Sequence, residues 1–206
     1  MSLQNRVAPN GEIVAVPERG LFMGNRGVLH DEHKRLGRRR WALKAWLICR
    51  LEFKGRQRAV MTPRRYTELF FFDEAAALAA GHRPCYECRR ADFRAWQAAW
   101  QDAQCLPRPP RAPEMDACLH VERIASKSRS PRTWICPAEE LPDGTFVAVG
   151  CIPHLVQGDG IRPWYWRGYG PMKVRPSGEI TVLTPPSSVA ALRAGYQPLL
   201  HPSAYR

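Results

Sequence analysis

The spacing of hydrophobic and polar positions predicts short strands toward both ends of the chain, with helices between them. Residues 13–16 form a short apolar stretch that is typical of an edge strand. The aromatic and aliphatic residues of 41–53 predict a longer strand, and the apolar run 68–72 predicts a buried one. Beyond residue 142, glycines separate short apolar pieces, a pattern typical of a β-meander.

Helices are predicted where start and stop signals bracket a suitable run. Asp73 is a good N-cap for the alanine-rich run 74–80, and Gly81 follows that run as a stop. Residues 89–104 predict a second helix with one aromatic face, most simply a core face, formed by Phe93, Trp96 and Trp100. Weaker patterns predict two further helices, at 114–125 and 187–194.

Composition places the chain among globular proteins. Hydrophobic residues make up 45% of the 206 positions and charged residues 24%, which excludes a wholly disordered chain. No run approaches the length of about 18 apolar residues that a membrane span requires, so we expect no membrane association. The first residues lack the apolar core of a secretion signal, and we therefore expect a cytoplasmic protein.

The charge is strongly basic. Lysine and arginine number 31 against 19 acidic residues, which gives a formal net charge of +12. Arginine predominates, and its planar fork of donors suits phosphate. The charge therefore favours a nucleic acid as the partner, and we expect DNA in preference to RNA. The alternative is an arginine-rich composition without any consequence for binding.

Two segments combine arginine with aromatic residues. The densest basic run contains Arg38, Arg39 and Arg40 and is followed by an aromatic ring, Trp41, so it predicts phosphate contacts beside a stacking surface. A solvated charged turn is the alternative. Residues 162–170 hold more aromatic residues than one core face needs, and they predict base-stacking positions or a hairpin core; the candidate stacking residues are Trp164 and Trp166.

Seven cysteines are many for a chain expected in the cytoplasm, where disulfides are rare. The informative pair is Cys85 and Cys88, a C-x-x-C directly after the predicted helix 74–80. Two thiolates at this spacing provide half of a tetrahedral zinc site. A redox pair would instead begin a helix within a βαβ unit, and no such pattern surrounds these cysteines.

The sequence around this pair resembles a known family. Residues 70–89 read FFFDEAAALAAGHRPCYECR, which is similar to the zinc-binding domain of the Ada (adaptive-response) DNA alkylation-repair proteins. In that family a strand, an alanine-rich helix and an R-P-C-x-x-C-R segment supply two of four zinc cysteines. One cysteine of the other pair accepts a methyl group from DNA methylphosphotriesters. The resemblance implies zinc and a DNA partner, and the two arginines of the segment, Arg83 and Arg89, join the predicted nucleic-acid contacts.

The chain also departs from the family pattern. The resemblance places the first cysteine pair near residues 54–58, which here read Lys-Gly-Arg-Gln-Arg. Cys49 is the nearest upstream cysteine, and His30 and His33 are the nearest histidines before it. We therefore expect either a structural zinc site of Cys49, Cys85, Cys88 and one histidine, or a lost site. Methyl transfer is not carried over.

Two polar clusters contain groups suited to proton transfer. In the glycine-containing segment 24–33, His30 stands beside Asp31, so it is a candidate general base; a polar surface loop is the alternative. Further along, His120 and Glu122 follow Asp116, and the alternative there is a helix-surface ion pair. A hydrolytic centre is expected if the two clusters meet, with His30, Asp31, His120 and Glu122 as its catalytic residues.

Together these patterns predict an α+β protein in two halves. Residues 1–104 form a basic, zinc-containing half with short strands and two helices, 105–113 a proline-rich connection, and 114–206 a β-rich half; one continuous domain is the alternative. The predicted function is zinc-containing DNA binding by an enzyme that repairs or processes damaged DNA, of glycosylase, lyase or nuclease type. A non-catalytic zinc-dependent DNA-binding regulator is the alternative, and a small-molecule enzyme is a weaker one.

Overall fold

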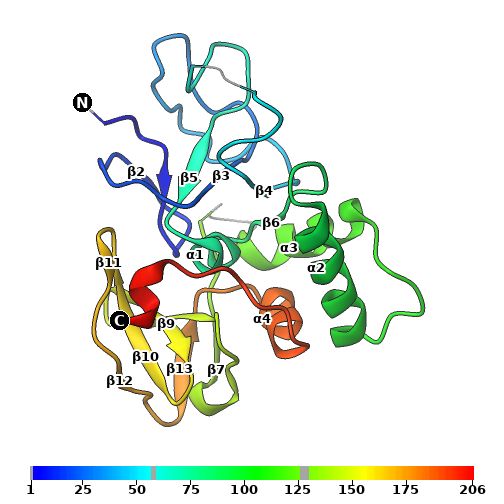
Figure 1. The fold of residues 1–206 in the computed structure, drawn as a ribbon, viewed down its shortest axis with the longest axis vertical. Helices are drawn as coiled ribbons and strands as arrows, with labels where there is room; N and C mark the ends of the chain where they lie inside the picture. Colours follow the sequence, from blue (N-terminus) through cyan, green and yellow to red (C-terminus); the bar gives the residue numbers. More distant parts are fainter. Residues whose placement is uncertain (1, 57–58, 126–129) are drawn as a thin grey trace.

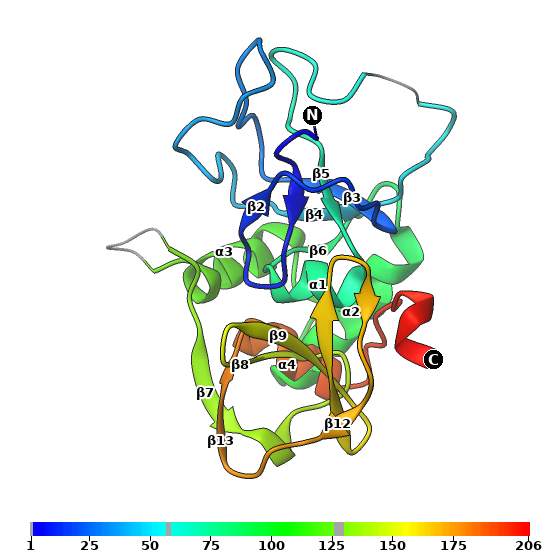
Figure 2. The same ribbon diagram turned by 90° about the vertical axis from the view of Figure 1, so that its left-hand side faces the viewer.

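Two β-sheets enclose a group of helices in the computed structural model, which describes residues 2–56, 59–125 and 130–206 (Figure 1). The described residues form an upper sheet from the first part of the chain and a lower sheet from the last part. The helices lie between the sheets and along one side, as the second view also shows (Figure 2). The predicted α+β class is confirmed.

The upper sheet is mixed, with strand order β2-β1-β5-β3-β4-β6. Its parallel pairs are β1 with β5 and β4 with β6. The predicted edge strand is confirmed, because β2 lies at one edge of this sheet. The strands are β1 (Arg6–Val7), β2 (Ile13–Val14), β3 (Phe22–Asn25), β4 (Leu47–Cys49), β5 (Leu69–Phe71) and β6 (Arg83–Pro84).

The long strand predicted over 41–53 is wrong, because only Leu47–Cys49 is a strand. The residues before it fold back instead. The N–H groups of Ala42 and Leu43 both donate to the carbonyl of Arg26, and the indole N–H of Trp46 donates to the carbonyl of Leu43. The residues before β4 therefore form an irregular loop rather than a strand, in which Trp46 is buried and Leu43 is exposed.

The lower sheet is antiparallel and has the strand order β11-β10-β9-β8-β13-β7, with β12 paired to β10. Consecutive strands β8 to β11 are neighbours, so the predicted meander is confirmed. The strands are β7 (Trp134–Pro137), β8 (Phe146–Val149), β9 (Ile152–Gln157), β10 (Gly160–Tyr165), β11 (Gly168–Tyr169), β12 (Lys173–Val174) and β13 (Glu179–Val182).

The helices are α1 (Glu74–Ala79), α2 (Arg90–Ala103), α3 (Ala112–Arg123) and α4 (Pro186–Arg193), with short 3₁₀ turns at Ala138–Glu140 and Pro202–Tyr205. The predicted N-cap is confirmed, since the Asp73 carboxylate accepts the N–H of Ala76 at 2.9 Å. The predicted stop is also confirmed, because Gly81 has a φ of +81°, a conformation that disfavours other residues.

The hydrophobic core extends across the predicted boundary at residues 105–113. The largest cluster combines Val7 and Phe71 of the upper sheet with Trp96 of α2, Leu119 of α3 and Leu192 of α4. A second cluster joins alanines of α1 to strands of the lower sheet. All six residues of α1 are buried, and the small side chains of its four alanines allow both sheets to approach this helix closely. The described residues of both predicted halves therefore share their cores.

Candidate metal centre

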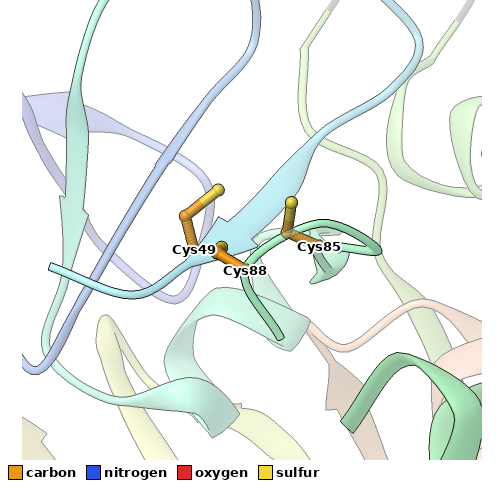
Figure 3. A group of neighbouring side chains, drawn as sticks. All are labelled: Cys49, Cys85 and Cys88. Atoms are coloured by element: carbon orange, nitrogen blue, oxygen red, sulfur yellow. The ribbon is translucent and has the colours of Figure 1, made fainter. Parts of the chain in front are cut away.

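The three cysteines predicted as zinc ligands lie together (Figure 3). Strands β4 and β6 pair in parallel, with Leu47 opposite Arg83 and Ile48 opposite Pro84. The N–H of Cys85 extends this register by donating to the carbonyl of Ile48 at 2.9 Å. Cys49 at the end of β4 and Cys85 just after β6 are thereby brought side by side. The turn that follows Cys85 returns Cys88 to the same place.

Every pair of the three sulfur atoms lies within 4.8 Å. The side chains of Cys49, Cys85 and Cys88 are buried, with exposed fractions of 8%, 7% and 9%. Partly buried apolar side chains pack against them, those of Met23, Leu47 and Phe53. The sulfurs therefore lie just beneath the surface, where water is largely excluded but a ligand can approach.

The local electrostatics favour a thiolate at Cys85, whereas the hydrogen bond with Cys85 and burial raise the pKa of Cys88. Hydrogen bonds from the Cys49 and Cys88 thiols lower the pKa of Cys85 to about 2, and the backbone N–H groups of Cys88 and Glu87 also donate to its sulfur. The backbone N–H of Arg50 donates to the Cys88 sulfur. The shared hydrogen bonds raise the pKa of Cys49. Metal ligation by cysteine requires thiolates, and N–H donors aimed at sulfur stabilise that form.

The cluster fits zinc by its donor chemistry, since thiolates are preferred zinc ligands. Within the described part of the chain, no histidine, cysteine, aspartate or glutamate joins the three cysteines as a fourth ligand. The predicted histidine ligand is therefore not found. The ring of His30 bonds instead to Thr67 Oγ1 at 2.6 Å and to the Thr62 carbonyl at 3.2 Å. His33 is exposed and lies beside Glu32.

The segment where the resemblance places the first cysteine pair contributes no ligand to the cluster among its described residues. Phe53 packs against the cluster just before the segment where the resemblance places the first pair, and the described residues of that segment, 54–56, are exposed. Positions 57 and 58 lie outside the described residues. Cys49 on β4 is the upstream cysteine that lies beside Cys85 and Cys88, so the candidate metal site among the described residues has three cysteines.

The predicted catalytic residues do not gather in one centre. The Asp31 carboxylate is exposed and accepts backbone N–H groups of its own turn, chiefly that of Arg35, which lowers its pKa. The His120 ring lies 4.6 Å from the Trp41 ring, between centroids, and burial lowers its pKa. Glu122 accepts the hydroxyl of Ser187 at 2.5 Å. Within the described residues, these groups form no shared cluster of ligand atoms.

Two of the predicted nucleic-acid contacts are wrong, because their side chains are buried. The guanidinium of Arg83 pairs with Asp116, and that of Arg89 pairs with Glu74; all four side chains are at most 8% exposed. Such groups already have carboxylate partners and offer a phosphate no access. The helix-surface ion pair predicted as the alternative for Asp116 is not found, because this carboxylate accepts hydrogen bonds from Arg83.

The remaining predicted contacts divide between surface and interior. Arg38, Arg39 and Arg40 are exposed, as their sequence context predicts. Trp164 is only 5% exposed and belongs to the core cluster of the lower sheet, so it is not a stacking platform. Trp166 is half-buried, with its ring 4.7 Å from that of Trp164. For Trp164, the alternative prediction of a position in a hairpin core is therefore confirmed.

Comparisons with protein-family models, with curated proteins and with solved structures find no match to this chain. None of the helices in the described part of the chain has the length and apolar character needed to cross a membrane. The functional argument therefore starts from the cysteine cluster and from the charges around it.

Proposed function

We propose that this protein binds zinc through Cys49, Cys85 and Cys88 and binds nucleic acid, DNA in preference to RNA, at the basic surface around that site. The observation that carries the proposal is the meeting of three buried sulfurs from two separate parts of the chain. Buried thiols that approach so closely are best explained by a shared metal ion.

Basic side chains surround the cluster. Arg50 follows Cys49 directly and is exposed. Arg56 pairs with Glu87 inside the C-x-x-C turn, and its guanidinium lies 5.4 Å from the Phe53 ring that covers the cysteines. On the other side, the guanidinium of Arg90 lies 5.1 Å from the Tyr86 ring. A phosphate backbone approaching the metal site would therefore meet the exposed Arg50 and Arg90, whereas Arg56 is shared with Glu87.

A second candidate function follows from the three-ligand cluster. Zinc bound by three cysteines keeps a fourth position for a group that is not part of the described chain, unlike a closed structural site. Bound zinc would keep the cysteines as thiolates, which are nucleophiles at neutral pH. One of these thiolates, such as Cys49, could then accept an alkyl group from damaged DNA; this candidate rests on the three-cysteine cluster, because the resemblance covers residues 70–89 only. The scattered positions of His30, Asp31, His120 and Glu122 give the hydrolytic alternatives no comparable support.

One experiment tests the main proposal directly. Protein purified without chelators is analysed for metal and then titrated with duplex DNA at several salt concentrations, before and after zinc removal. We expect one zinc per chain and an affinity that falls steeply with salt, because neutralised phosphates release counterions. Absence of zinc contradicts the metal assignment, and absence of DNA binding at low salt contradicts the nucleic-acid assignment.

The second candidate needs a different measurement. The zinc-loaded protein is incubated with DNA carrying methylphosphotriesters, and its peptides are examined by mass spectrometry. Methylation of Cys49 supports alkyl acceptance, and Cys49→Ser should abolish it. Unmodified cysteines after complete incubation with an excess of such DNA leave binding without chemistry as the function.

A further inference from the structure

A cavity of about 380 Å³ lies between the β1–β2 hairpin, the loop before β4 and the end of α3. Figure 2 shows the hairpin beside the end of α3. None of the three cluster cysteines lines the cavity, so it is separate from the metal centre. Its size is in the range of small-molecule sites.

Two buried arginines line this cavity without carboxylate partners. Arg26 is 2% exposed and Arg123 is 4% exposed, and their guanidinium carbons lie 3.9 and 3.7 Å from the centroid of the Trp46 ring. Arg26 donates to His82 Nε2 and to the Gly11 carbonyl. Arg123 donates to the carbonyls of Gly81 and Lys44. In the described residues, neither guanidinium lies within ion-pair distance of a carboxylate.

These two side chains also keep unused donors. Arg26 Nη2 and Arg123 Nε are buried and have no hydrogen-bond partner among the described residues. Burial and the charge of Arg123 lower the pKa of Arg26. Asp116 raises the pKa of Arg123 by its charge, but this carboxylate is already paired with Arg83. Buried charges and hydrogen-bond donors normally have partners. This part of the molecule therefore has an excess of positive charge that a bound anion would neutralise.

The rim of the cavity continues the same chemistry. Exposed Arg40 and Arg132 line it, and Glu12 is the single acidic side chain among its described lining residues. Trp41 adds a half-buried aromatic ring. Guanidinium forks match the oxygens of phosphate, and a phosphate monoester carries almost two negative charges near pH 7.

We propose that this cavity binds the terminal phosphate group of a phosphate monoester, with Arg26 as the buried anchor and Arg40 and Arg132 at the rim. A free nucleotide and the phosphorylated end of a nucleic-acid strand present this same group. The inference rests on the cavity alone and does not require the proposed DNA binding.

The test uses the full chain in a phosphate-free chloride buffer, with inorganic phosphate and adenosine monophosphate as probes. Binding is measured by calorimetry, and the melting temperature is followed because a ligand that binds the folded state raises it. We expect adenosine monophosphate to bind and to raise the melting temperature, whereas adenosine and sodium chloride at equal ionic strength do not. No binding of any phosphate monoester, free or on a strand end, overturns the proposal.

Variants locate the site. Arg26→Gln should weaken phosphate-monoester binding about ten- to a hundredfold, the loss expected for charged hydrogen bonds. If that variant fails to fold, the exposed double variant Arg40→Gln/Arg132→Gln tests the rim instead and should weaken binding. The matched control Arg38→Gln/Arg39→Gln removes two neighbouring exposed charges that do not line the cavity. Equal weakening in the control and in the rim variant overturns the assignment.

Paired oligonucleotides identify the source of the phosphate. A 5′-phosphorylated single strand is compared with the same strand ending in a 5′-hydroxyl. Tighter binding of the phosphorylated strand, lost in the rim variant, supports a strand-end site. Equal binding of both strands, together with binding of adenosine monophosphate, supports a free nucleotide. The latter result would stand even if DNA binding at the metal site failed.

Discussion

The guanidinium of Arg83 forms a two-point ion pair with the carboxylate of Asp116, with N–O distances of 2.8 and 2.7 Å. This pair joins β6, which leads into the C-x-x-C turn, to α3, and both side chains are buried. Asp116→Ala should therefore destabilise the protein by about 3–5 kcal/mol, because a buried charge is left without a partner. Chemical denaturation measures the change. The surface variant Asp102→Ala on α2 should stay within about 0.5 kcal/mol of the wild type.

Cys85→Ala and Cys88→Ala should each lose the bound zinc and destabilise the chain, because metal-binding free energy contributes to folding. Cys151→Ala is the matched control, since that cysteine is exposed and lies outside the cluster. Metal analysis and thermal unfolding of the three variants check this. Retention of full zinc content by both cluster variants contradicts the assignment.

Replacement of Arg38, Arg39 and Arg40 together by glutamine should weaken DNA binding and flatten its dependence on salt. Each lost phosphate contact reduces the slope of log affinity against log salt by about 0.9 for duplex DNA. Titrations at four or more salt concentrations give this slope. An unchanged slope would exclude this run from the binding surface and leave the basic side chains around the metal site as the phosphate contacts.

His30→Ala should reduce stability without affecting zinc content or DNA affinity. The His30 ring is buried and bonded to Thr67 Oγ1 and to the Thr62 carbonyl, so truncation removes two hydrogen bonds at a cost of about 1–3 kcal/mol. Denaturation, metal analysis and a DNA titration on the same sample separate the roles. Lost zinc would restore His30 as a ligand, and lost activity at wild-type stability would restore it as a catalytic residue.

Burial raises the pKa of Asp73 from an ordinary value of 3.8 to about 6. The folded chain therefore holds this proton more tightly than the unfolded chain. Its contribution to stability is complete below about pH 4 and is lost as the pH rises through 6. Relative to Asp73→Asn, the wild type should lose about 3 kcal/mol between these limits. Parallel pH–stability profiles of the two proteins would contradict this.

Local signals in the sequence predicted much of this structure. The Asp73 cap, the Gly81 stop and the alternation of glycines with apolar residues act over a few positions, so α1 and the meander could be recognised without tertiary information. The C-x-x-C spacing likewise indicated two ligands. Cys49 was named as the third because it was the nearest cysteine upstream, and the parallel pairing of β4 with β6 brings it there.

Partners distant in sequence could not be predicted in the same way. Arg83 and Arg89 are predicted nucleic-acid contacts from the segment that carries the family resemblance, yet each meets a buried carboxylate contributed by another element. The stacking of Arg26 and Arg123 on Trp46 could not be predicted, because nothing in their neighbouring residues indicates that the fold brings them together. Their proximity is visible only in the tertiary structure.

The largest core cluster connects Val7, near the start of the chain, with Tyr196, near its end. During synthesis on the ribosome, the apolar surface that α2 and α3 present to α4 must therefore wait for α4 before it can be covered. Growing chains expose this surface until α4 has been made, which makes them substrates for chaperones and prone to aggregation at high expression rates. Slower synthesis or early supply of metal to the cysteine cluster should raise the yield of folded protein.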